Sequence, residues 1–117
     1  HPMVAQVMCP MLPSDPGYTI WARDFTGGCG LFSFVLASDD LRASGRVVDA
    51  LEFFGLGYSW GGYESLALPI SPHMHREAMA CPTRSEAGTQ PAIRLSIGLE
   101  DPRDLIEDLA QALEAID

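Results

Sequence analysis

The sequence predicts an α+β protein: a small antiparallel sheet of about four strands with helices packed on one face. Strand-like and helix-like segments are interleaved in the order strand, short helix, strand, helix, strand, strand, helix, strand, helix. The length of 117 residues suits a single domain spanning residues 1–117. The hydrophobic fraction of 47% and the charged fraction of 20% are those of an ordinary globular protein.

The first half of the chain contains two predicted strands and two predicted helices. Met3–Met8 alternates loosely around its valines, and the aromatic and branched residues of Leu31–Leu36 give the clearest strand. Tyr18–Phe25 carries large apolar side chains at helical spacing. A second amphipathic helix is expected over about Ser44–Phe54, and Gly55 and the next glycine should end it.

The second half begins with two short extended pieces on either side of a glycine pair, Gly61–Gly62. Ser71 followed by Pro72 predicts the start of a short helix. Ala92–Ile97 alternates as a strand, with Arg94 on the face opposite to its large apolar side chains. Residues 82–91, which precede this strand, are expected to form a loop.

The last helix has the clearest start signals. Asp101 is a favourable N-cap, Pro102 fits the first helical position, and Asp104 lies at the positive end of the helix dipole. One apolar stripe is predicted to face the sheet, and it consists of Leu105, Ile106, Leu109, Leu113 and Ile116.

The net charge of −9 argues against nucleic acids and anionic membrane surfaces as partners. No apolar run approaches the roughly 20 residues of a membrane-spanning helix. The start, HPMVAQV, lacks the basic and apolar regions of a secretory signal and has no initiator Met, so we expect a processed or truncated cytoplasmic chain. All seven cationic side chains are arginine, and the chain contains no lysine.

The cysteines and histidines give little evidence of a disulfide or metal site. Cys9, Cys29 and Cys81 are odd in number and form no CxxC pair, so we expect small buried thiols in a reducing compartment. His73 and His75 would point apart on a helix, and no carboxylate or thiol is placed to complete a ligand set. No metal site is predicted.

The stretch GYSWGGYESLALP, residues 57–69, is the first candidate for function. Its aromatic residues and hydroxyls suit the wall of a ligand pocket, and they suit equally well the packing around a glycine turn. Arg94 is the second candidate, because a lone guanidinium on an apolar strand can bind a carboxylate through two hydrogen bonds. The alternative for Arg94 is a structural ion pair with Glu100 or Asp101.

Three stretches together resemble a known family. IWARDFTGGCGLFSFVL, YSWGGYESLALP and AIRLSIGLEDPRDLIEDLAQAL are similar to the C-terminal part of the pyridoxal-phosphate enzymes of cysteine and methionine metabolism. The likeness runs from about Val4 to Ile116, with little similarity over residues 72–91. The Ser59-Trp60 pair and the RDFTG…GLFSF stretch resemble the bacterial cystathionine β-lyase branch more than the γ-synthase or γ-lyase branches.

The resemblance implies a C-terminal domain of the fold-type I pyridoxal-phosphate enzymes, from a lyase that splits cystathionine into homocysteine, pyruvate and ammonia. It implies that Arg94 binds the substrate α-carboxylate and that Ser59, the candidate catalytic residue, lies near that carboxylate and the catalytic lysine. Trp60 would complete the same wall, and Tyr58 would lie toward the distal end of the substrate. The resemblance also implies a homotetrameric full-length enzyme that acts in methionine biosynthesis.

The absence of lysine sets a limit on what this chain does alone. In the family, the cofactor forms a Schiff base with an active-site lysine of a separate cofactor-binding domain. We therefore expect no cofactor-binding residue in this chain, no activity of the chain alone, and an exposed apolar face that promotes self-association. The alternatives are the same domain of a γ-synthase or γ-lyase, and a non-catalytic module that binds a small carboxylate through Arg94.

Overall fold

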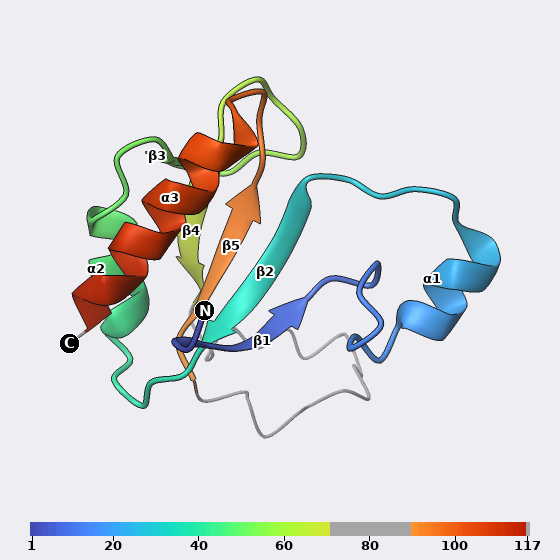
Figure 1. Cartoon of the computed structure of the whole chain (residues 1–117), viewed down its shortest axis with the longest axis horizontal. Helices are drawn as coiled ribbons and strands as arrows, with labels where there is room; N and C mark the ends of the chain where they lie inside the picture. Colours follow the sequence, from blue (N-terminus) through green and yellow to red (C-terminus); the bar gives the residue numbers. More distant parts are fainter. Residues whose placement is uncertain (71–89, 117) are drawn as a thin grey trace.

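The computed structural model describes residues 1–70 and 90–116 of the chain. In chain order the elements are β1 (Val4–Met8), α1 (Tyr18–Asp24), β2 (Leu31–Leu36), α2 (Ala43–Asp49), β3 (Gly55–Leu56), β4 (Leu66–Ile70), β5 (Ala92–Ser96), α3 (Pro102–Leu113) and the short 3₁₀ helix η2 (Glu114–Ile116). The strands form one sheet in the order β1-β2-β5-β4-β3 (Figure 1). The predicted α+β class is confirmed.

The sheet differs from the prediction at one edge. It has five strands rather than about four, and its last pair, β3 with β4, is parallel while all other neighbours are antiparallel. A β-carbon at Gly55 would lie 2.9 Å from Cδ2 of Leu66, its partner in this pair. The close approach of the two strands at this point therefore suits glycine.

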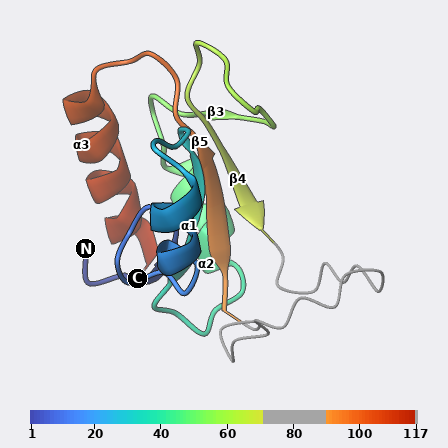
Figure 2. The same cartoon turned by 90° about the vertical axis from the view of Figure 1, so that its right-hand side faces the viewer.

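The hydrophobic core lies between the sheet and helices α2 and α3. In the edge-on view of Figure 2, α3 runs along one side of the sheet. The buried core residues of the central strands are Phe34, Leu36, Ile93, Leu95 and Ala67, and those of the helices are Ala43, Val47, Leu105, Ala112, Leu113 and Ile116. Because side chains alternate along a strand, Arg94 lies on the face away from these helices, as the sequence predicts.

Helix α3 begins as predicted, but its buried face is different. The Asp101 side chain accepts a hydrogen bond from the backbone N–H of Arg103 at 2.9 Å, and Pro102 is the first helical residue. Ile106, predicted to face the core, is instead 65% exposed. Asp108 on the same helix is buried at 4% exposure, so a carboxylate occupies part of the inner face.

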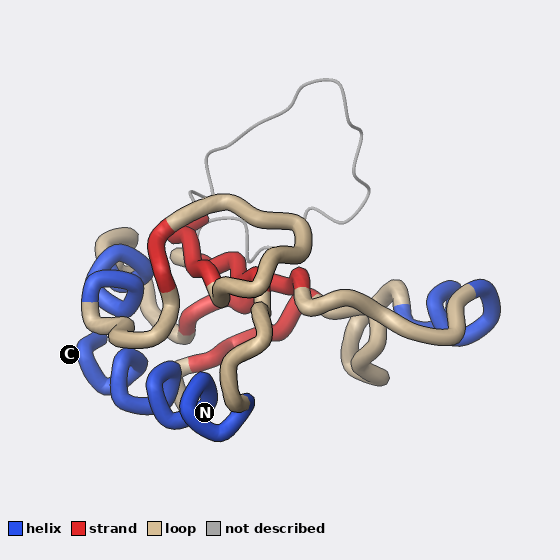
Figure 3. The backbone as a smooth tube through the Cα atoms, turned by 90° about the horizontal axis from the view of Figure 1, so that it is seen from above, coloured by secondary structure: helices blue, strands red, loops and turns tan. Residues whose placement is uncertain are grey.

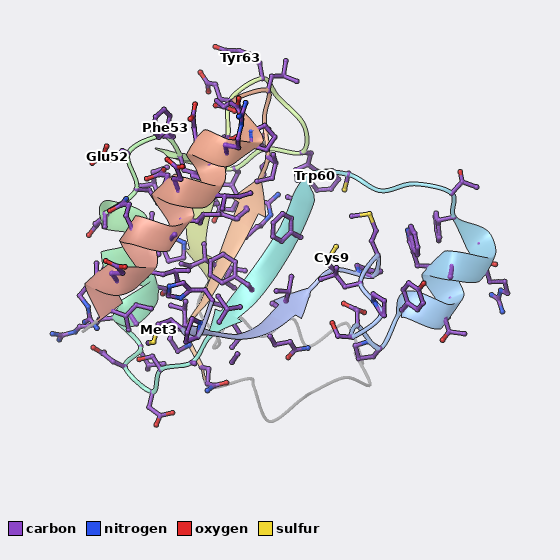
Figure 4. All side chains as sticks on the ribbon, viewed as in Figure 1. Met3, Cys9, Glu52, Phe53, Trp60 and Tyr63 are labelled. Atoms are coloured by element: carbon purple, nitrogen blue, oxygen red, sulfur yellow. The ribbon has the colours of Figure 1, made fainter. Side chains whose placement is uncertain are left out.

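Helix α2 is shorter than the predicted Ser44–Phe54 and ends at Asp49. The reason lies in α3: the Asp108 carboxylate accepts hydrogen bonds from the backbone N–H groups of Glu52, Phe53 and Phe54, at 2.9, 2.8 and 3.4 Å. These N–H groups are satisfied by a side chain rather than by helical carbonyls, so the chain turns toward β3. Figure 4 shows Glu52 and Phe53 beside α3.

Helix α1 lies apart from the rest of the fold. It matches the predicted Tyr18–Phe25 to within a residue, but none of its residues is buried. Seen from above, it projects away from the sheet on the side opposite to α2 and α3 (Figure 3). Within the described part of the chain, no helix has the length and apolarity needed to cross a membrane.

Several predictions fall on residues that the structure does not describe. These are the short helix at Ser71 and Pro72, most of the loop at residues 82–91, and the positions of His73, His75 and Cys81. Cys9 is buried, as expected for a small thiol, but the same expectation is wrong for Cys29, which is exposed.

Candidate functional site

The residues singled out in the sequence lie around one loop. This segment, residues 57–65, connects the parallel strands β3 and β4, and we call it the aromatic loop. Its turn is formed at Gly61, whose φ of +132° is a conformation that side-chain-bearing residues rarely adopt. The loop lies at the end of the sheet where Leu66 pairs with Ser96, two residues beyond Arg94 on β5.

Arg94 extends from the central strand toward this loop. In the sheet it is paired with Ser33 of β2 and Leu68 of β4, so these residues share its face. Its Nη2 donates a hydrogen bond of 2.8 Å to the backbone carbonyl of Ser59. Its guanidinium carbon lies 5.8 Å from the centre of the Tyr58 ring, within cation–π range.

The structural ion pairs considered for Arg94 are not formed. Glu100 is hydrogen-bonded to Ser65, and Asp101 caps α3 and pairs with Arg103 at 3.3 Å. Among residues 1–70 and 90–116, no ion pair joins Arg94 to a carboxylate. Within residues 1–70 and 90–116, the hydrogen-bond partner of Nη2 is a neutral carbonyl, so no described carboxylate balances the guanidinium charge.

The side chains of the other predicted site residues do not gather closely around Arg94. The Ser59 hydroxyl oxygen accepts the backbone N–H of Gly61 at 3.2 Å and so stabilises the turn. Tyr58 is 79% exposed although it contacts Arg94, and Trp60 is 89% exposed. Figure 4 shows Trp60 and Tyr63 at the end of the molecule where the aromatic loop lies, far from Met3. The structure brings the Ser59 backbone carbonyl and the Tyr58 ring to Arg94, whereas the Ser59 hydroxyl faces the Gly61 N–H and Trp60 is exposed to solvent.

One polar cluster beside the loop was not identified from the sequence. Ser65 is 1% exposed; its N–H and hydroxyl donate to the two carboxylate oxygens of Glu100 at 2.8 and 2.7 Å. The backbone N–H of Gly98 donates to the Ser65 hydroxyl oxygen at 2.8 Å. The hydrogen bond from the Ser65 hydroxyl, reinforced by backbone N–H groups, holds the pKa of Glu100 below its usual value. The sequence offered only the signal of a serine directly before an apolar strand.

Comparison with known proteins agrees with this fold. A family model described as Cys/Met metabolism PLP-dependent enzyme matches residues 1–114. The chain is 47% identical to the cystathionine beta-lyase MetC of Escherichia coli K12 over 111 residues, which is 93% of this chain and 27% of that protein. It is 40% identical to the cystathionine gamma-lyase of Sus scrofa over 116 residues, 98% of this chain and 28% of that protein.

A solved structure of cystathionine gamma synthase from Xanthomonas oryzae pv. oryzae, in complex with aminoacrylate and cysteine, has the same fold. It superposes with a TM-score of 0.76 at 38% sequence identity, covering 99% of this chain and 30% of that chain. The chain thus spans less than a third of the length of each of these relatives. The family resemblance in the sequence motifs is confirmed: the chain belongs to the pyridoxal-phosphate-dependent enzymes of cysteine and methionine metabolism.

Proposed function

We propose that this chain is the C-terminal, substrate-binding domain of a longer pyridoxal-phosphate-dependent carbon–sulfur β-lyase. The full-length enzyme would convert cystathionine and water to homocysteine, pyruvate and ammonia. The observation that carries the proposal is Arg94, a guanidinium at the centre of the sheet that has no carboxylate partner among the described residues. As in its family, the enzyme would be a cytoplasmic homotetramer that acts in methionine biosynthesis.

The proposed role of Arg94 is to bind the α-carboxylate of the amino-acid substrate. The planar guanidinium can form two parallel hydrogen bonds to a carboxylate, which fixes both the position and the tilt of the substrate. Fixing the carboxylate limits rotation about the bond to Cα, and so orients the Cα–H bond for proton removal. The hydrogen bond to Ser59 and the contact with Tyr58 restrict the arginine in turn.

Three loop residues would complete the substrate site. We propose that the neutral Ser59 hydroxyl lies near the carboxylate and orients the catalytic amine without adding charge. Trp60 would form part of the wall, and its exposure here leaves it free to contact substrate or other parts of the enzyme. Tyr58 would lie toward the distal end of cystathionine.

The chain does not provide the covalent attachment point of the cofactor. Pyridoxal phosphate supplies this family with an electron sink and is attached through a lysine amine. None of the 117 residues is lysine, so the residues present do not fit the attachment of this group. We therefore propose that this chain binds and orients the substrate and, through Ser59, helps to orient the catalytic amine, and we expect the chain alone to be inactive.

The test of the proposed role is a substitution of Arg94 in the full-length enzyme. Losing the charged pair to the carboxylate should lower kcat/KM for cystathionine about 100-fold in Arg94→Gln. Arg94→Lys should be nearly as impaired, because an ammonium group cannot make the paired contact. Arg103→Gln, whose side chain is 86% exposed, is the control. An unchanged kcat/KM in Arg94→Gln would refute the proposed role.

The reaction type is decided by the product. Relatives of this chain include both a β-lyase and a γ-lyase. We propose β-cleavage because the Ser59-Trp60 pair resembles the β-lyase branch. Pyruvate as the product from cystathionine is the expected result. Release of 2-oxobutyrate would instead assign the enzyme to the γ-lyases.

A second candidate is a non-catalytic module that binds a small carboxylate through Arg94, and the absence of lysine favours it. The coding sequence upstream of this chain discriminates between the two. A pyridoxal-phosphate domain with its lysine in the same reading frame would exclude the second candidate.

A further inference from the structure

The C-terminal end of the aromatic loop is fixed by a partly buried hydrogen-bonded pair, Ser65 and Glu100. Ser65 is almost completely buried, and both its N–H and its hydroxyl donate to the Glu100 carboxylate. Glu100 lies in the connection between β5 and α3, 35 residues further along the chain. A hydrogen bond to a charged acceptor is stronger than one between neutral groups, so this pair holds β4 and the connection in a defined register.

Two further contacts join the same segments. The Gly98 N–H donates to the Ser65 hydroxyl oxygen at 2.8 Å, so this oxygen both donates and accepts. The Leu99 N–H donates to the Tyr63 carbonyl at 2.9 Å. A β-carbon at Gly98 would lie 2.7 Å from the Ser65 nitrogen, so the two backbones are in direct contact. Residues 63–65 are therefore anchored to residues 98–100.

The rest of the loop has little apolar packing to hold it. Tyr58, Trp60 and Tyr63 are 79%, 89% and 72% exposed. Because burial of apolar surface contributes little here, polar contacts must define where the loop lies. In the described part of the chain, such contacts include the Ser65–Glu100 pair, the hydrogen bonds from the N–H groups of Gly98 and Leu99 to residues 63–65, and the hydrogen bond from Arg94 to Ser59.

We propose that Ser65 and Glu100 are positioning residues, which set the place of the aromatic loop relative to Arg94 and thereby the affinity for the substrate carboxylate. The proposal rests on the proposed function of Arg94. Without the pair, residues 63–65 lose their register on the β5–α3 connection. Ser59 then shifts against the guanidinium, and the carboxylate site loses its fixed geometry. A misplacement on the scale of 1 Å is costly for an oriented substrate.

The test compares Ser65→Ala, Glu100→Ala and Glu100→Gln in the full-length enzyme. We expect KM for cystathionine to rise about tenfold in the two alanine variants and kcat to fall by a smaller factor, because a carboxylate site without fixed geometry both binds and orients the substrate less well. Glu100→Gln keeps one acceptor oxygen and should fall between wild type and Glu100→Ala. The matched controls are Ser44→Ala, a buried serine in α2, and Glu107→Gln, an exposed carboxylate in α3.

A second measurement reports on the loop itself. With 5-fluorotryptophan incorporated, the fluorine NMR line of Trp60 is identified by its loss in Trp60→Phe. This line should shift or broaden in Ser65→Ala and Glu100→Ala and stay unchanged in both controls. An unmoved Trp60 line in the two alanine variants would overturn the positioning role, whatever Arg94→Gln does to activity. A moved line with wild-type KM would also overturn it, since loop position would then not govern affinity.

The two proposals fail in different ways. An Arg94→Gln enzyme with an unchanged kcat/KM would refute the function assigned to Arg94 but would leave the Trp60 line to report on the loop. A loss of thermal stability in Ser65→Ala, without any change in KM or in the Trp60 line, would reduce the pair to a structural role and so overturn the proposal.

Discussion

The Asp108 carboxylate accepts a hydrogen bond of 2.8 Å from the backbone N–H of Phe53, 55 residues earlier in the chain. It also accepts the N–H groups of Glu52 and Phe54, and the Gln111 amide donates to it at 2.9 Å. One buried side chain thus accepts hydrogen bonds from the backbone N–H groups of the turn that follows α2, and so links this turn to α3. This turn leads directly into β3 and the aromatic loop.

Substitution of Asp108 should therefore destabilise the fold. Asp108→Ala leaves buried N–H groups at residues 52 to 54 without an acceptor, and we expect the free energy of unfolding to fall by about 3 kcal/mol. Urea denaturation measures this change. Glu107→Ala, at the exposed neighbouring position of the same helix, should change the stability by less than about 0.5 kcal/mol. Equal effects of the two substitutions would contradict the prediction.

The same carboxylate gives the stability a pH dependence. Burial alone would raise the pKa of Asp108, but the N–H groups of Glu52 and Phe53 and the Gln111 amide together hold it below its usual value. Since the folded pKa is lower than the unfolded pKa of about 4, the carboxylate stabilises the protein above that pH. This stabilisation is lost as the pH falls through the folded value.

The comparison of wild type with Asp108→Asn isolates this contribution. We expect the difference in free energy of unfolding between the two proteins to be largest at neutral pH and to shrink below about pH 4. Urea titrations at a series of pH values provide the measurement. A difference that stays constant through this range would show that the charge of Asp108 does not contribute.

Local signals allowed much of the fold to be predicted from the sequence, and non-local contacts explain the errors. The predicted start of α3 is correct because Asp101 and Pro102 act locally, as the N-cap and the first residue of the helix. The predicted end of α2 is wrong because the actual end depends on Asp108, which is remote in sequence. Ile106 was misplaced because hydrophobic periodicity does not anticipate a buried carboxylate on the inner face of a helix.

In the candidate site, too, local signals were predictable from the sequence and non-local contacts were not. Alternation along β5 correctly placed Arg94 on the face away from α2 and α3. Its contact with the Ser59 carbonyl depends on the parallel pairing of β3 with β4, which the sequence pattern did not reveal. The pairing of Ser65 with Glu100 spans 35 residues and depends on the same register. The roles of Ser59, Trp60 and Tyr58 toward substrate stay predictions.

Position 98 should tolerate no residue larger than glycine. A β-carbon there would meet the Tyr63 carbonyl oxygen and lie 2.5 Å from the Glu64 carbonyl carbon, and these backbone atoms cannot move aside cheaply. We expect Gly98→Ala to lower the free energy of unfolding by about 2 kcal/mol. Gly45→Ala in α2 is the matched control, because nothing lies within 4 Å of its added β-carbon.

The control should change stability in the opposite direction. Alanine favours the helical conformation over glycine, so Gly45→Ala should raise the free energy of unfolding by about 0.5 to 1 kcal/mol. Thermal or urea denaturation of both variants under the same conditions tests the pair. If Gly98→Ala were as stable as wild type, the direct backbone contact between residues 63–65 and Gly98 would be wrong.

The exposed apolar surface of the isolated chain predicts self-association. Beside α1, an open hollow of about 350 Å³ is lined by Pro10, Gly17, Ile20, Trp21 and Phe25. Ile20 and Phe25 are 58% and 61% exposed. Contiguous apolar surface of this kind binds other apolar surfaces, and a second copy of the chain offers one. We expect the chain to bind a hydrophobic dye and to form oligomers whose fraction rises with concentration in sedimentation experiments.

Polar substitutions in α1 and at Phe25, which directly follows it, should weaken this association. Ile20→Ser combined with Phe25→Ser removes two of the apolar side chains that line the hollow, so dye fluorescence and the oligomer fraction should both fall. Leu41→Ser, 51% exposed and distant from α1 in sequence, is the control and should leave both unchanged. A monodisperse monomer that does not bind the dye would contradict the prediction, and equal effects of the control would mean that α1 is not the surface involved.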